Sequence, residues 1–74
     1  MSAAKPIQLQ VNNSGAWKTV CRFDAEDHAA GHKVMDAAFL LQEVDPTLKF
    51  RIATADALAV ALMHLHKGEW KVSR

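Results

Sequence analysis

The chain has 74 residues, of which half are hydrophobic and 23% are charged, and its formal net charge is +1. This length gives one small domain with a modest core and excludes a large enclosed active site. The apolar content excludes a disordered chain, and the net charge is too small to indicate a nucleic-acid or membrane partner by itself. We expect a single domain over residues 1–74, with residues 1–5 as a disordered tail.

Charge is unevenly distributed along the sequence. Six of the eight acidic residues lie between Asp24 and Asp45, and this stretch contains one basic residue, Lys33. The acidic stretch has helical periodicity, whereas the basic flanks alternate as strands do. The sequence therefore predicts an acidic helix and a basic sheet.

A β-hairpin is predicted at the start of the chain. Ile7, Leu9 and Val11 alternate with polar residues, and residues 12–15 supply turn-forming side chains. In the returning strand every second position is expected to face the core, namely Trp17, Thr19, Cys21 and Phe23. The positions expected to face solvent are Lys18, Val20 and Arg22.

Residues 25–44 are predicted to form a helix. Asp24 is a favourable N-cap, and Asp45 ends the helix because the residue before a proline avoids the α region. Apolar residues at helical spacing form one contiguous stripe that is expected to face the sheet. This stripe consists of Ala30, Val34, Ala37, Ala38 and Leu41.

The last third of the chain is predicted to complete the sheet. Apolar residues from Leu48 to Ile52 alternate with lysine and arginine, which indicates a third strand. Residues 55–66 also alternate, and we prefer a strand there, although Thr54 capping an alanine-rich helix is the alternative. Residues 70–72 are expected to add a short terminal strand or to cover one rim of the core.

The predicted fold is α+β, a two-layer β-β-α-β-β arrangement with one helix packed on one face of an antiparallel sheet. The alternative is β-β-α-β-α, with residues 55–66 helical. The expected core consists of Trp17, Phe23, Val34, Ala38, Leu41, Phe50, Ile52, Val60 and Leu62.

Two histidine pairs are the only candidate metal ligands. His28 and His32 have the i, i+4 spacing of a helix face, and His64 and His66 have the i, i+2 spacing of a strand face. Two such pairs would supply a four-nitrogen site for zinc or nickel. Ordinary solvent-exposed histidines explain the same residues, so we expect neither a metal nor a cofactor.

Catalysis is not expected. Cys21 lies on the inward face of its predicted strand, and free cysteine is among the most buried residue types. The carboxylates of the predicted helix are typical of a solvated face. The sequence contains no glycine-rich phosphate loop, nucleophile elbow or dinucleotide fingerprint. The chain is therefore predicted not to be an enzyme.

A basic outer sheet face is one candidate binding surface, because cations on neighbouring strands would follow a phosphate backbone. Sheets that bind single strands stack bases on exposed aromatic residues, however, and the strand aromatics are predicted here to face the core. The predicted basic face consists of Lys18, Arg22, Lys49 and Arg51.

Met35 and Phe39 form a second candidate surface, an apolar flank of the predicted helix next to its histidines. We expect a non-catalytic protein-interaction or adaptor module, self-associating as a homodimer through this flank or through a free strand edge. Nucleic-acid binding by the basic face is the alternative. A cytoplasmic location without a membrane partner is expected, since the sequence has one cysteine and no long apolar segment.

Overall fold

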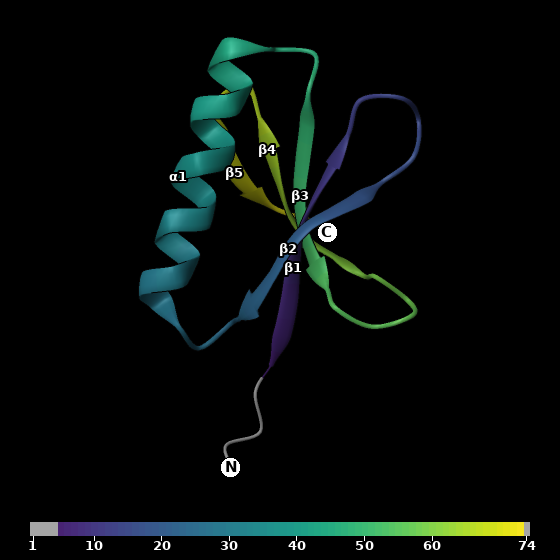
Figure 1. The fold of residues 1–74 in the computed structure, drawn as a ribbon, viewed down its shortest axis with the longest axis vertical. Helices are drawn as coiled ribbons and strands as arrows, with labels where there is room; N and C mark the ends of the chain where they lie inside the picture. The colour runs from purple at the N-terminus through teal and green to yellow at the C-terminus, as the bar shows by residue number, and fades with distance from the viewer. Residues whose placement is uncertain (1–4, 74) are drawn as a thin grey trace.

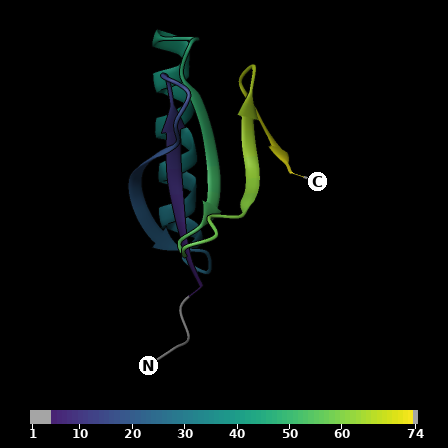
Figure 2. The same cartoon turned by 90° about the vertical axis from the view of Figure 1, so that its right-hand side faces the viewer.

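Within residues 5–73, which the computed structural model describes, five strands form one antiparallel sheet in the order β2-β1-β3-β4-β5. One helix, α1, connects β2 to β3 and packs on one face of this sheet (Figure 1). The opposite face carries no helix and is turned toward the viewer in Figure 2. The α+β prediction with one helix on one sheet face is therefore confirmed. The strands are β1 (Pro6–Asn12), β2 (Lys18–Asp24), β3 (Lys49–Thr54), β4 (Ala61–His66) and β5 (Glu69–Val72), and α1 is His28–Val44.

Residues 1–4 of the predicted tail lie outside the described residues. Lys5 is described and is bonded to the fold, since its carbonyl accepts a hydrogen bond from Ala25 N at 2.9 Å. At the other end of the chain, residues 69–72 form strand β5, which is the first of the two alternatives expected for residues 70–72.

Residues 55–66 contain a strand, as preferred, but it begins only at Ala61. The segment before β4 is a loop, because Asp56 Oδ1 accepts hydrogen bonds from the backbone of Leu58 at 3.1 Å and of Ala59 at 3.0 Å. This loop leaves Val60 51% exposed. The prediction of Val60 as a core residue was wrong. The alternation of apolar and small side chains had been extended into a loop whose backbone is hydrogen-bonded to Asp56.

The face assignment within β4 also differs from the prediction. Met63 and Leu65 pack toward the core, whereas Leu62 is 37% exposed. The pairing of β3 with β4 is irregular between Ile52 and Ala53, so Leu62 is the additional residue of β4. Such a bulge shifts the alternation of side chains between the two faces.

Helix α1 begins three residues later than predicted. Asp27 is its N-cap and accepts a hydrogen bond from Ala30 N at 3.0 Å, whereas Asp24 accepts one from Glu26 N at 2.9 Å in the turn before the helix. The chain contains two aspartates with capping chemistry, and only the second is followed by helical backbone. The helix ends at Val44, as predicted.

The core lies between α1 and the covered sheet face. Ala38 of the helix is fully buried. Phe50 in β3 is 2% exposed and is the largest of the fully buried side chains. Leu41 is 49% exposed, so its prediction as a core residue was wrong: it lies at the border of the helix face that contacts the sheet, about 60° around the helix from Ala38. The fully buried cluster is Leu9, Ala38, Phe50, Ile52 and Leu65.

Candidate functional site

A row of paired residues crosses all five strands on the helix-free face. Gln10 pairs with Arg51, Arg51 pairs with His64, and His64 pairs with Lys71 on β5. Thr19 of β2 completes the row beside Gln10. Residues paired across an antiparallel sheet share a face, so this face carries a hydrogen-bonding and cationic row where the covered face carries apolar side chains.

Two glutamines on this face are buried although no helix covers them. Gln8 is 4% exposed and Gln10 is 6% exposed. Gln8 Nε2 donates to the Thr54 carbonyl at 2.8 Å, and Gln8 Oε1 accepts from the Thr19 hydroxyl at 2.6 Å. Both polar ends of this buried amide are therefore satisfied.

The second buried glutamine holds an arginine in place. Arg51 Nε donates to Gln10 Oε1 at 2.7 Å, and the Arg51 guanidinium carbon lies 4.3 Å from the ring centroid of Trp17. This is cation–π geometry. The Trp17 ring also meets His64 edge-on, with centroids 6.2 Å apart, and the His64 ring is hydrogen-bonded to the Ser73 hydroxyl.

Trp17 thus lies on the helix-free face, and its prediction as a core residue was wrong. The register of β1 with β2 shifts between Leu9 and Gln10, which makes Val20 the additional residue of β2. Cys21 and Phe23 still face the core as predicted, but every position before the bulge has changed face. Alternation read along β2 from Phe23 therefore gives the wrong side for Trp17.

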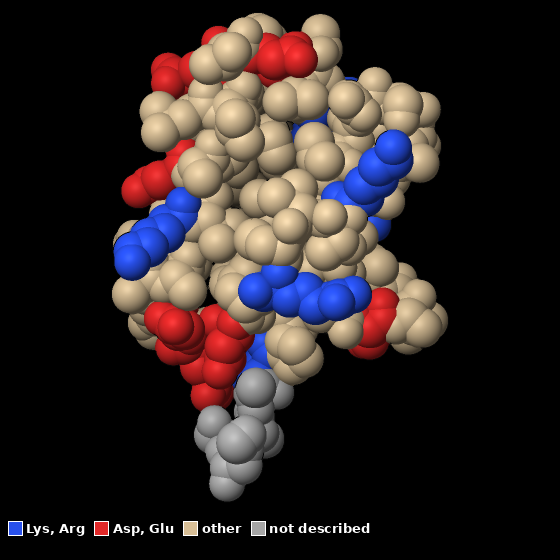
Figure 3. Space-filling model, viewed as in Figure 1, with Lys and Arg blue, Asp and Glu red and all other residues tan. Residues whose placement is uncertain are grey.

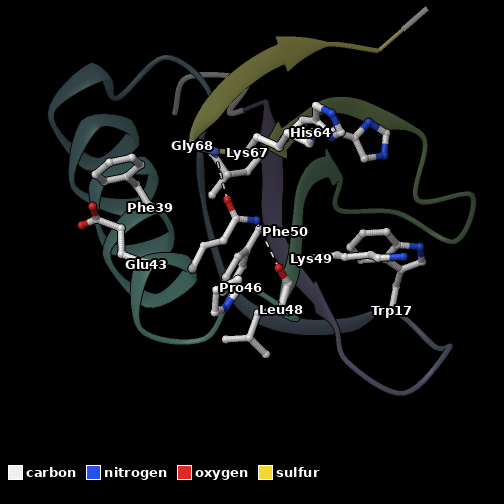
Figure 4. A pocket seen from close by; sticks show the side chains of 13 residues that line it. Trp17, Phe39, Glu43, Pro46, Leu48, Lys49, Phe50, His64, Lys67 and Gly68 are labelled. Carbon is white, nitrogen blue, oxygen red and sulfur yellow. Dashed lines mark hydrogen bonds between the residues drawn. The ribbon is translucent and has the colours of Figure 1, made fainter.

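The accessible part of Trp17 borders a cavity of about 790 Å³ at the end of the sheet where β3 begins and β4 ends. Figure 4 shows Lys49 and His64 on the same side as Trp17, with Phe39 and Glu43 of α1 on the other side. Glu43 is the one acidic side chain in the described lining. The basic and imidazole side chains of this lining are Lys49, His64, His66 and Lys67.

Three of the four predicted basic-face residues lie on the helix-free side. Arg22 pairs with Gln8, Lys49 pairs with Asn12, and Arg51 belongs to the row described above. Lys18 pairs instead with Val11, which packs against the core, so the bulge transfers Lys18 to the helix side. The basic face is therefore narrower than predicted, but it includes an aromatic ring that the prediction placed in the core.

The two histidine pairs lie on different elements, with His28 and His32 exposed on α1 and His64 and His66 on β4. No group of three or more potential metal ligands occurs among residues 5–73. His64 and His66 line the cavity beside Trp17, whereas His28 and His32 line a separate groove of about 260 Å³ on the helix side of the sheet. The structure therefore does not bring the four candidate ligands together.

Met35 and Phe39 are partly buried and pack against the core cluster. The Met35 carbonyl accepts a hydrogen bond from Trp70 Nε1 at 3.4 Å, and Phe39 contacts the tight turn at Gly68. Their flank of α1 thus faces the β4–β5 hairpin, and their contact with a partner stays a prediction. Cys21 is partly buried next to the same core, which agrees with its expected inward position.

Among the described residues no helix has the length and apolar character needed to cross a membrane. Comparison of the chain with protein-family models, with curated proteins and with solved structures finds no match.

Proposed function

We propose that this protein binds a single-stranded nucleic acid on the helix-free face of its sheet, as a binding module without catalytic chemistry. The observation that carries the proposal is the position of Trp17, which borders the strand-end cavity beside Lys49 and has Arg51 stacked on its ring. Sheets that bind single strands combine an aromatic platform for a base with cations for the phosphates. Trp17 supplies the platform that the sequence had placed in the core.

Preorganisation supports this proposal. Arg51 is held by Gln10 and Trp17, so less side-chain entropy is lost when its guanidinium meets a phosphate. Lys49 and Lys67 in the cavity lining, with Arg22 further along the face, extend the positive charge along the path proposed for the nucleic-acid backbone. Acidic residues are concentrated at both ends of α1 (Figure 3), and of these Glu43 lines the cavity, on the side opposite Trp17.

The two tryptophans allow a direct test. Trp17 is on the helix-free face, whereas Trp70 packs on the helix side against Met35. In a Trp70→Phe variant, which keeps Trp17 as the one tryptophan, a single-stranded oligonucleotide of about 12 nucleotides is expected to quench the fluorescence. In the matched Trp17→Phe variant the remaining fluorescence is expected to change little.

Affinity measurements complete the test. Trp17→Ala is expected to weaken binding about 10- to 100-fold, the range found for loss of one base-stacking contact. Lys49→Glu should also weaken binding and make it less dependent on salt. The matched charge reversal Lys5→Glu should have little effect, because Lys5 precedes the first residue of β1, at the end of this strand that lies away from the cavity. Absence of binding to DNA or RNA at low salt, or equal effects of the two reversals, would refute the proposal.

A further inference from the structure

The outer flank of α1, defined here as Ala37, Leu40, Leu41 and Val44, is an apolar surface that the sheet does not cover, and the half-buried Val34 lies at its edge, where it also packs against the core. Leu40 is 58% exposed, Leu41 is 49% exposed and Val44 is 85% exposed. The helix packs on the core through the fully buried Ala38 and the partly buried Val34, Met35 and Phe39. Large apolar side chains gathered on one exposed helix flank are typical of an interaction surface.

The spacing of this flank indicates what kind of element covers it. Positions 34, 37, 41 and 44 recur at intervals of three and four residues, so their side chains form one stripe along the helix. A stripe of this width fits a second helix, because the ridges of one helix pack into the grooves of another. Small Ala37 beside large Leu41 leaves space for a large side chain from that second helix.

The charges of α1 indicate which helix this is. Lys33 is the one basic residue of α1 and adjoins the outer flank, because it lies one turn before Ala37 at i, i+4 spacing. The last turn of α1 contains no basic residue, and Asp45 follows as its C-cap, so this end of the helix is negative. A second α1 running antiparallel would bring each Lys33 to the negative end of the other helix.

We infer that two copies of this chain associate through their outer flanks, with the two α1 helices antiparallel. In the register that places Lys33 opposite Asp45 of the partner subunit, Leu41 meets Ala37 of the partner subunit and Val44 meets Val34 of the partner subunit. Each large side chain then faces a small or medium one, as close helix packing requires. The arrangement is isologous, because the same stripe of both subunits forms the interface.

This association does not depend on nucleic-acid binding, because no residue of the outer flank lines the cavity beside Trp17, although Phe39 and Glu43 of the same helix do. An interface made by one helix flank is small, so a dissociation constant in the micromolar range is expected rather than a permanent dimer. The outer flank also differs from the flank of Met35 and Phe39, which faces the β4–β5 hairpin. Substitutions can therefore distinguish the two flanks.

The test is sedimentation equilibrium of the full chain from about 1 µM to about 500 µM, a range that brackets micromolar association. The unsubstituted protein is expected to shift from monomer to dimer, and Val44→Glu is expected to keep it monomeric. Leu58→Glu is the matched control, because Leu58 is also apolar and 81% exposed but lies in the loop before β4. This control should dimerise as the unsubstituted protein does.

A second variant tests the orientation of the helices. Lys33→Glu is expected to raise the dissociation constant about 3- to 30-fold, since the dimer contains two pairings of a lysine with a negative helix end. Far-UV circular dichroism verifies that each variant is folded. A monomer at every concentration, a dimer that survives Val44→Glu, or equal losses in Val44→Glu and Leu58→Glu would overturn the inference.

Discussion

The two faces of the sheet are stabilised by different interactions. The covered face is apolar and packs against α1, with Phe50 and Ile52 of β3 almost fully buried. The helix-free face also buries side chains, but these are Gln8 and Gln10, each enclosed by hydrogen-bonding partners. Burial on the first face is non-directional, whereas burial on the second depends on specific donors and acceptors. The covered face therefore supplies most of the stability, and the helix-free face fixes the positions of Arg51 and Trp17.

Phe50→Ala tests the covered face and should have the largest effect. Phe50 is the largest of the fully buried side chains, and its removal leaves a cavity between α1 and the sheet. We expect the free energy of unfolding to fall by about 3–5 kcal/mol. The core of a domain this small rarely supplies more than about 3–5 kcal/mol of net stability, so the variant should be partly unfolded near room temperature. Urea denaturation followed by circular dichroism measures the difference.

A loss below about 1 kcal/mol would show that the covered face tolerates a cavity and would reduce the contrast between the two faces. Leu58→Ala is the matched control, because it removes an apolar side chain that is 81% exposed. Its effect should lie within about 0.5 kcal/mol of zero.

Gln8→Leu tests the helix-free face and should have an intermediate effect. The substitution leaves the Thr54 carbonyl and the Thr19 hydroxyl without their glutamine partners. We expect a loss of about 1–3 kcal/mol in the free energy of unfolding, because the buried carbonyl keeps its desolvation cost and loses its hydrogen bond. Urea denaturation measures this loss.

The double variant Gln8→Leu, Thr19→Val completes a thermodynamic cycle with the two single variants. Because both partners of one hydrogen bond are then apolar, the double variant should lose less stability than the sum of the single losses, by about 0.5–1.5 kcal/mol. Additive losses would mean that the hydrogen bond between these side chains contributes nothing to the stability of this face.

The covered face could largely be predicted from the sequence, because alternation in β1 and β3 and the helical stripe of α1 both depend on local periodicity. Leu9, Phe50 and Ala38 follow such periods and are buried. The helix-free face could not be predicted in the same way. The bulge in β2 moves Trp17 to the helix-free side, and the bulge in β4 leaves Leu62 37% exposed in the groove on the helix side. A bulge is defined by pairing with a neighbouring strand, so local periodicity does not show it.

The candidate site was missed for the same reason. Arg51 and Lys49 were identified as outward-facing cations, and both lie on the helix-free face. The residues that fix Arg51 come from other strands and loops, with Gln10 41 positions earlier in the sequence. No local pattern distinguishes a buried, hydrogen-bonded glutamine from a solvated one, so Gln10 offered no signal. The sequence signal against continued alternation is the group of turn-forming residues 12–15 just before Trp17.

Asp56 lies in the loop before β4, outside both faces, and should have the smallest effect. The pKa of Asp56 is lowered from 3.8, first because the Thr54 hydroxyl donates to its carboxylate and then because the backbone of Ala59 and Leu58 donates as well. A lowered folded-state pKa means that this stabilisation is fully present above the unfolded-state pKa and is lost as the pH falls through the folded-state value. Asp56→Asn keeps an acceptor oxygen but removes the charge.

The Asn variant should therefore be slightly less stable than the unsubstituted protein near neutral pH, and the difference should shrink as the pH falls from the unfolded-state pKa through the lowered folded-state pKa of Asp56. Because the carboxylate is exposed and screened by solvent, this difference should be smaller than the effect of Gln8→Leu. Urea midpoints of the two proteins between about pH 2 and pH 7 measure it. A constant difference across this range would mean that the loop depends on the acceptor geometry of residue 56 and not on its charge. An effect as large as that of Gln8→Leu would mean that the loop stabilises the helix-free face, so that the two faces could no longer be compared as independent regions.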